Sequence, residues 1–359
     1  MTAAVPVLIV ASIDLVARQS FASGLLLDLP HAAVVTHDLE RGGLRRVVTD
    51  RGGVRYDDHQ SLDHACLACA VREDLVPTLH QLAEDGRWHQ IVLALPVSAD
   101  PYTVVALLHQ AIRQGACGPA VLAGTVTLVD PTTLVEDLFG DDLLADRGLA
   151  LGLVDRRAVG EALARQIESA DLVATSVAAE GTPATLLQHL TRSAGPATGW
   201  NHLDGNELLQ RRLDWPAFQR RTDPLYLAPH AERTDPDVWT LDLTSARAFH
   251  PDRLHERIED LGRGAFRARG HFWLPTRPDA VCVWDGGGGQ LSIGRAGSWH
   301  PQRPSTRLVI TGLDPTDRTR VTEAFGDVLL TTTETVTARS WAGRTDGFEP
   351  WLDEHATAA

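Results

Sequence analysis

The sequence predicts an α/β protein whose first domain holds a parallel sheet with flanking helices, followed by a small α+β domain. Two observations lead to this fold class. In the first half of the chain, short apolar runs alternate with segments of helical spacing, as in parallel strands joined by helices. In addition, 359 residues exceed the length of one typical domain, so we expect two.

The first domain is expected over residues 1–195. Short continuous apolar runs, typical of strands buried on both faces, predict strands at 5–11, 32–36, 90–95, 124–129 and 171–175. Apolar residues at helical spacing predict helices at 15–27, 72–84, 101–115 and 156–169. In the second of these helices, Pro77 would have to lie in the first turn, where the missing backbone N–H costs nothing.

The second half has a different composition. Residues 196–236 are rich in Pro, Gly, Asp and Arg with weak periodicity, and we expect a linker there. The α+β domain is expected over 237–330, and 331–359 forms a tail without a clear pattern. Within that domain we predict strands at 239–243, 266–274, 280–284, 290–294 and 306–311, helices at 251–261 and 317–326, and a hairpin turn at Gly286–Gly289.

Charge and composition exclude several classes of function. The formal net charge is −14, which argues against broad binding of a nucleic-acid backbone, so no direct DNA contact is expected. All 33 basic side chains are arginine, which excludes a lysine Schiff base and the lysine of a phosphate-binding loop. No signal peptide or membrane-spanning apolar run is visible, so we expect a cytoplasmic protein with reduced thiols.

Two cysteines at C-x-x-C spacing form the most informative motif. Cys66 and Cys69 can bind one metal ion together, and His64 and His59 lie just before them in the chain. Zinc takes such a mixture of sulfur and imidazole ligands in tetrahedral geometry. A redox-active pair and two buried apolar thiols are the alternatives. Further candidate ligands follow the second predicted strand, namely His37 together with Asp38 or Glu40.

Several segments resemble the CobW family of P-loop GTPases. They are Cys66–Leu75, which is similar to the family's cysteine motif with its middle cysteine replaced, Gln166–Asp171, Ala248–Leu254, Arg267–Asp279 and Gly294–Trp299. The resemblance implies a GTPase-like N-terminal domain with a P-loop-like sheet, followed by a CobW C-terminal domain. It also implies that the protein handles a metal ion.

The nucleotide motifs of that family are not preserved. The stretch that matches its P-loop, Ser12–Gln19, contains no glycine and places Arg18 where the lysine would be. Ala94 falls at the acidic metal-binding position, and Ser176–Ala179 at the guanine-reading motif lacks the carboxylate. Asp14 adds negative charge where a phosphate would lie. We therefore expect neither GTP binding nor enzymatic activity.

A narrower resemblance exists to actinobacterial CobW-like proteins with an eroded P-loop, among them the mycobacterial ribosome-hibernation recruitment factor. It implies a non-enzymatic, zinc-responsive adaptor that recruits a hibernation factor to the ribosome when zinc is limiting. A CobW-type zinc metallochaperone with weak GTP use and a thiol redox switch are the alternatives. A partner-binding face is predicted in the C-terminal domain, although strand alternation explains the same pattern: Arg267, Arg269, His271, Trp273 and Arg277.

Overall fold

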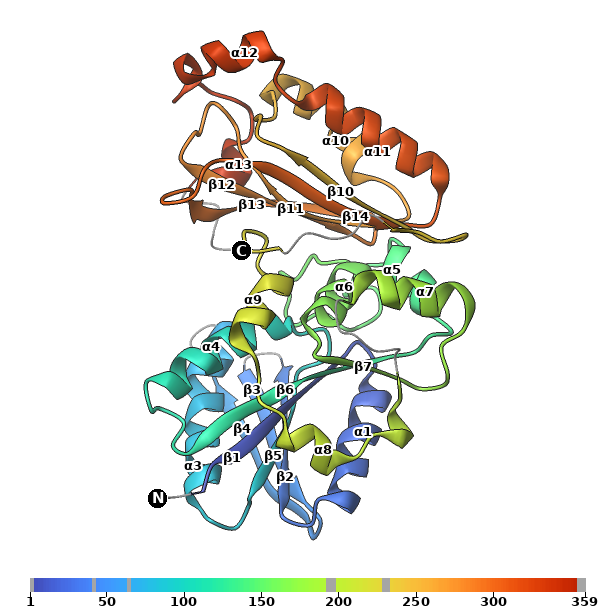
Figure 1. Ribbon diagram of the computed structural model, residues 1–359. Coiled ribbons are helices and arrows are strands. Elements are labelled where there is room, and N and C mark those ends of the chain that lie inside the picture. Colours follow the sequence, from blue (N-terminus) through green and yellow to red (C-terminus); the bar gives the residue numbers. More distant parts are fainter. Residues whose placement is uncertain (1–2, 41–42, 63–65, 192–197, 228–232, 354–359) are drawn as a thin grey trace. The chain divides into compact units, whose positions relative to one another are not determined.

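A computed structural model gives the structure of the chain, and it divides into two compact units (Figure 1). The first unit comprises residues 1–135 and 143–218, and the second comprises 136–142 and 219–359. The residues that the structure describes are 3–40, 43–62, 66–191, 198–227 and 233–353. Among them, no helix combines the length and the apolar character needed to cross a membrane.

The first unit is built on a mostly parallel sheet, as predicted. Its eight strands within the described residues are ordered β4-β3-β2-β5-β1-β6-β7-β8. The pairings of β2 with β3 and of β3 with β4 are antiparallel, and the other pairings are parallel. The strands are β1 (Val5–Ser12), β2 (Ala32–Glu40), β3 (Gly43–Asp50), β4 (Gly53–Ser61), β5 (Gln90–Ala94), β6 (Ala120–Val129), β7 (Leu172–Thr175) and β8 (Thr198–Gly199).

Helices cover both faces of this sheet because the central strand is apolar on both sides. On β1, Val7 and Ile9 pack with α3 and α4, whereas Leu8 and Val10 pack with α1 and α8. The helical segments of this unit are α1 (Leu15–Asp28), α2 (Leu67–Ala70), the π-helical turn η1 (Val71–Leu75), α3 (Val76–Glu84), α4 (Pro101–Arg113), α6 (Val159–Ser169), α7 (Gly181–Leu190), η2 (Trp200–His202) and α8 (Gly205–Gln210). Two helices begin in the first unit and end in the second, namely α5 (Leu134–Phe139) and α9 (Trp215–Thr222).

The hairpin of β3 and β4 is a correction to the sequence prediction, which placed no strands there. Residues 53–57 of β4 are exposed, so the strand lacks the apolar alternation that identifies a half-buried strand. Cross-strand ion pairs stabilise it instead: Arg45 Nη2 lies 2.8 Å from Asp57 Oδ2, and Arg46 Nη2 lies 2.8 Å from Asp58 Oδ2. These pairs cannot be recognised before the register is known.

Residues 196–236, for which the sequence predicted a linker, contain η2, α8, α9 and the short strand β9 (Arg233–Thr234). The helix α9 carries Phe218, which is fully buried in the core of the first unit. Trp215 on the same helix stacks on His109, with ring centroids 4.2 Å apart. Isolated aromatic anchors of this kind hold a short helix without giving the sequence a periodic pattern.

The second unit contains an antiparallel sheet with helices on one face (Figure 1). Its six strands within the described residues are ordered β13-β12-β11-β14-β10-β9. The core side of β11 presents Phe266, Ala268 and Phe272 to the helices α10 and α11. The further elements of this unit are β10 (Trp239–Ser245), α10 (Pro251–Gly262), β11 (Phe266–Phe272), β12 (Ala280–Gly287), β13 (Gln290–Ser298), β14 (Thr306–Gly312), α11 (Pro315–Val328), α12 (Thr332–Thr337), the 3₁₀ turn η3 (Ala338–Trp341) and α13 (Glu349–Leu352).

One turn and one close contact between strands in this sheet depend on glycine. The predicted hairpin turn is confirmed: Gly288 and Gly289, with φ of 57° and 69°, form the two-residue connection between β12 and β13. In the middle of β11, a Cβ added at Gly270 would lie 1.9 Å from the carbonyl oxygen of Arg307 on β14. Only glycine therefore allows these two strands to approach so closely.

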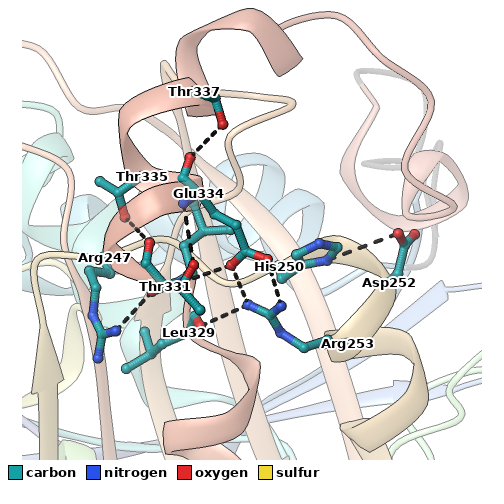
Figure 2. A network of polar contacts seen from close by, with 10 residues as sticks. Arg247, His250, Asp252, Arg253, Leu329, Thr331, Glu334, Thr335 and Thr337 are labelled. Atoms are coloured by element: carbon teal, nitrogen blue, oxygen red, sulfur yellow. Dashed lines mark hydrogen bonds and ion pairs between the residues drawn. The ribbon is translucent and has the colours of Figure 1, made fainter.

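Residues 331–353 contain helical elements that the sequence pattern did not predict. Specific polar contacts hold the first of them, α12 (Figure 2). Thr331 and Glu334 form a reciprocal capping box at the start of α12. Both carboxylate oxygens of Glu334 also accept hydrogen bonds from Arg253 on α10, at 2.9 and 2.8 Å. Further along, Phe348 is buried in the core of the second unit.

Candidate metal-binding site

The structure brings Cys66 and Cys69 together as two adjacent free thiols. Cys66 is the N-cap of the short helix α2, and its Sγ accepts a hydrogen bond from the backbone N–H of Cys69 at 3.3 Å. The two Sγ atoms lie 2.9 Å apart. Cys66 is exposed and Cys69 is half-buried, whereas the remaining free cysteines, Cys117 and Cys282, are fully buried in the two cores.

This dithiol has the chemistry of a metal ligand pair. Zinc–sulfur bonds of about 2.3 Å in a tetrahedral site place two sulfurs about 3.8 Å apart, so the two Sγ atoms need to separate by about 1 Å. The exposed side chain of Cys66 has space for that movement. The hydrogen bond between the two thiols and, as a smaller cause, burial raise the pKa of Cys69 to about 11. Metal binding at neutral pH would therefore release its proton.

Of the other predicted metal ligands, His37 and His59 lie in the described part of the chain, and neither forms a metal-binding group with this pair. Among the described residues, no group of three or more His, Cys, Asp and Glu side chains is arranged to hold a metal ion. His59 lies on the exposed strand β4. His37 is buried on β2, with Nε2 2.8 Å from Asp74 Oδ2. Glu40 ends β2, and its side chain lies outside the described part of the chain, as does residue His64.

Asp74 is a buried carboxylate that the sequence interpretation did not single out. It lies in the π-helical turn η1, directly after the cysteine-bearing helix, and contacts two side chains of the sheet. Arg46 Nη1 donates to Asp74 Oδ1 at 2.6 Å and to Thr78 Oγ1 at 2.7 Å. With His37 on its other oxygen, Asp74 anchors the segment that carries Cys69 to β2 and β3. Its helical spacing from Val71, three residues earlier on the buried side of the turn, is the signal that could have identified it.

In the turn between β1 and α1, a side chain of the protein itself occupies the backbone N–H donors of the helix N-terminus. It consists of Ile13 and Asp14, because β1 ends at Ser12 and α1 begins at Leu15. The carboxylate of Asp14 accepts hydrogen bonds from the backbone N–H groups of Val16, at 2.7 Å, and Ala17, at 3.1 Å. The protein's own carboxylate therefore takes the donors that a bound anion would need.

The arginine at the position of the P-loop lysine makes its contacts inside the first unit. Arg18 is fully buried, and its guanidinium makes two hydrogen bonds to the carboxylate of Asp38 at the end of β2. Its Nη1 also donates to the carbonyl oxygen of Leu95, just after β5, at 2.7 Å. Ala94, at the acidic position of the second nucleotide motif, is buried and offers no carboxylate.

The predicted partner-binding residues lie mainly inside the second unit, which corrects the expectation of an exposed face. Arg267, Arg269 and His271 alternate along β11 on the side away from its apolar core, and all three are buried. Arg269 donates to the carbonyl oxygen of Arg221, and His271 Nδ1 lies 2.8 Å from that of Pro224. A preceding segment of the same unit therefore covers this side of the strand.

The remaining two residues of that predicted face bind the C-terminal segment. Trp273 is half-buried and packs on a small apolar cluster with Trp341. Arg277 contacts both carboxylate oxygens of Asp346, each at 3.0 Å, and pairs with Asp353. Burial alone would lower the pKa of the Arg277 guanidinium. The hydrogen bonds to Asp346 and Asp353 together have a larger effect in the opposite direction, so the pKa of Arg277 is raised.

Comparisons with known proteins show which domains the two units resemble. Residues 31–192 match the CobW/HypB/UreG nucleotide-binding domain, and residues 238–329 match the cobalamin synthesis protein CobW C-terminal domain. The two matches follow each other along the chain and correspond to the mostly parallel sheet and the antiparallel sheet. The chain is therefore similar, in order, to the nucleotide-binding domain and the C-terminal domain of CobW-type proteins.

Individual relatives are similar over most of the chain. A zinc chaperone of Mycobacterium tuberculosis and an uncharacterized protein of Mycobacterium bovis are each 27% identical over 97% of this chain and 94% of their own length. The zinc-regulated GTPase metalloprotein activator 1 of Dictyostelium discoideum is 21% identical over 74% of this chain and 60% of its own length.

Among solved structures, a Zn(II)-bound YjiA GTPase from E. coli matches 90% of this chain and 99% of its own, with 13% identity and a TM-score of 0.34. That likeness is too distant to bear on function. None of these comparisons concerns a ribosome-hibernation factor, so the narrower resemblance stays a prediction.

Proposed function

We propose that this chain is a zinc-handling protein of the CobW type, which holds zinc as cargo through Cys66 and Cys69 and does not hydrolyse GTP. The observation that carries the proposal is the pair of free thiols 2.9 Å apart on a solvent-accessible turn. The names of two relatives support it, since one is a zinc chaperone and the other a zinc-regulated metalloprotein activator.

The ligand set suits an ion that is passed on. The described residues supply two thiols, whereas a structural zinc site is closed by four protein ligands. Two thiols fill two positions of a tetrahedral shell, and a partner protein's ligands can occupy others during transfer. Because Cys66 is exposed, such ligands can approach the ion from solvent and exchange with the cysteine sulfurs.

The β1–α1 region supports the absence of GTP use. Asp14 takes the N–H donors at the start of α1, and Arg18 is held by Asp38, so neither is available to phosphate. Ala94 cannot hold a magnesium ion. The protein would then act by binding and releasing zinc alone, and the difference in zinc affinity between it and its partner would drive the transfer.

Metal analysis of purified protein tests this proposal. Wild-type protein prepared without chelator should contain one zinc per chain, and Cys66→Ser and Cys69→Ser should each lose it, because the thiolate is the strong zinc ligand. Cys117→Ala removes a buried thiol elsewhere in the first unit and serves as the matched control. Stoichiometric zinc in a Cys66→Ser/Cys69→Ser double variant would place the site elsewhere and contradict the proposal.

A narrower role follows from the sequence resemblance alone: recruitment of a hibernation factor to the ribosome in zinc limitation. The acidic chain, with a net charge of −14, favours a basic protein partner by electrostatic complementarity. Pull-downs from zinc-replete and zinc-starved lysates test this role. Recovery of no ribosome-associated protein under either condition would reject it while leaving zinc binding unaffected.

A further inference from the structure

The two thiols of the metal-binding pair differ in accessibility. Cys66 precedes the first helical residue of α2 and is exposed, whereas Cys69 lies within the helix and is half-buried. The backbone N–H of Cys69 donates to Cys66 Sγ, which holds the exposed sulfur next to that of Cys69. A reagent in solution therefore meets Cys66 first.

The geometry also allows a covalent bond between the two sulfurs. They are 2.9 Å apart, compared with about 2.05 Å in a disulfide, so closure requires a movement of about 1 Å. Both cysteines belong to one helical turn, and neither is fully buried. Cys117 and Cys282 are fully buried and have no part in this chemistry.

We propose that this pair is also a thiol–disulfide exchange site for low-molecular-weight disulfides, with Cys66 as the attacking thiol and Cys69 as the resolving thiol. The inference concerns the same two residues as the proposed zinc site, and it adds a second, oxidised state that excludes the ion.

The exchange proceeds in two balanced steps. First, the Cys66 thiolate attacks one sulfur of a disulfide RSSR, the S–S bond of RSSR breaks, and one thiolate RS⁻ leaves. This forms a mixed disulfide between Cys66 and R. The Cys69 thiolate then attacks Cys66 Sγ, forms the internal disulfide and releases the second RS⁻. In total the protein dithiol loses two electrons and two protons, and RSSR is reduced to two molecules of RSH.

The oxidised and zinc-bound states exclude each other. A disulfide sulfur carries no thiolate charge and is a poor zinc ligand, whereas zinc-bound thiolates are withheld from attack. Oxidation would therefore release zinc, and zinc would protect the pair from oxidation.

Treatment of native, metal-free protein with oxidised glutathione tests the inference by intact mass and peptide mapping. Wild-type protein should lose two hydrogen atoms without retaining glutathione. Cys69→Ser should keep one glutathione on Cys66, because no resolving thiol remains. Cys66→Ser should be modified at Cys69 at least about tenfold more slowly, owing to its lower accessibility. A Cys117→Ala control should behave as the wild type.

Two results would overturn the assignment of roles: a stable glutathione adduct on the wild type, or equal modification rates for the two single variants. Circular dichroism of each variant establishes that it is folded. Zinc content measured on the same preparations separates the two proposals. Zinc binding without an internal disulfide rejects the exchange site alone, whereas an internal disulfide without zinc binding rejects the zinc proposal alone.

Discussion

The guanidinium of Arg18 and the carboxylate of Asp38 are joined by two hydrogen bonds, of 2.6 Å from Nη1 to Oδ1 and 3.1 Å from Nη2 to Oδ2. Arg18 lies in the first turn of α1, at the position of the lysine in a P-loop, and Asp38 lies near the end of β2. The basic side chain at the position of the phosphate-binding lysine thus connects a helix to the sheet in this protein.

We predict that the protein does not bind GTP, and that Arg18→Lys does not create binding. The lysine variant restores the basic residue of a P-loop, but Asp14 still caps α1 and the turn still lacks glycine. Calorimetry with GTP and magnesium should detect no binding for either protein. A low-micromolar dissociation constant, equivalent to about −8 kcal/mol, would contradict the prediction.

Asp74→Asn should lower the free energy of unfolding of the first unit by about 2 kcal/mol, because it breaks a buried charge pair with Arg46. Thermal denaturation measures the loss. Asp57→Asn is the matched control: its pair with Arg45 is exposed to solvent, so the loss of stability should be much smaller than for Asp74→Asn.

The same Asp74→Asn protein should keep its full zinc content, because the thiols that bind the ion are unchanged. Loss of zinc from a variant that remains folded would show that the anchoring of η1 positions Cys69 for the metal.

Gly270→Ala should destabilise the second unit by at least about 2 kcal/mol, since the added Cβ would overlap the carbonyl oxygen of Arg307 and force β11 and β14 apart. Gly326→Ala on α11 is the matched control, because its Cβ would meet no atom within 4 Å and alanine favours a helix. Urea denaturation of the two variants should shift in opposite directions. Equal midpoints would contradict the close strand approach.

Acid should weaken the attachment of α12. Hydrogen bonds from Arg253, and then from the backbone N–H of Thr331, lower the pKa of Glu334 from 4.5 to about 2. A carboxyl whose pKa is lower in the folded state stabilises that state above its unfolded pKa. This contribution is therefore complete above about pH 4.5 and is lost as the pH falls towards 2. Because the pair is partly exposed, we expect about 1 kcal/mol.

Hydrogen exchange of the α12 amides at pH values between 5 and 3 measures this effect. Wild-type protection should fall with pH, after correction for the intrinsic exchange rate, whereas Glu334→Gln should show low and pH-independent protection. Glu323→Gln removes an exposed carboxyl from α11 and should follow the wild type. A wild-type profile that is flat over this range would refute the role of Glu334.

Buried apolar strands were the most predictable part of the fold. The runs around Ile9, Val92 and Val126 have too little polar character to lie anywhere but in the centre of a sheet, and the structure places them there. The β3–β4 hairpin was not predictable, because its stability depends on cross-strand ion pairs such as Arg45 with Asp57. Sequence spacing does not show which charges face each other.

At the site, the sequence identified the dithiol because its two ligands are only three residues apart. It could not show that His37 turns to Asp74, since that contact joins a strand to a helix 37 residues further on. Alternation correctly placed Arg267, Arg269 and His271 on one side of β11. Which segment covers that side depends on tertiary structure, and so their burial was missed.

X-ray absorption at the zinc edge, on protein loaded with one equivalent of zinc, tests the central claim most directly. The account predicts two sulfur scatterers at about 2.3 Å, together with nitrogen or oxygen ligands that complete the shell. The Cys66→Ser variant should show one sulfur or no bound zinc. A zinc shell of nitrogen and oxygen alone in the wild-type protein would contradict the assignment of the ion to Cys66 and Cys69.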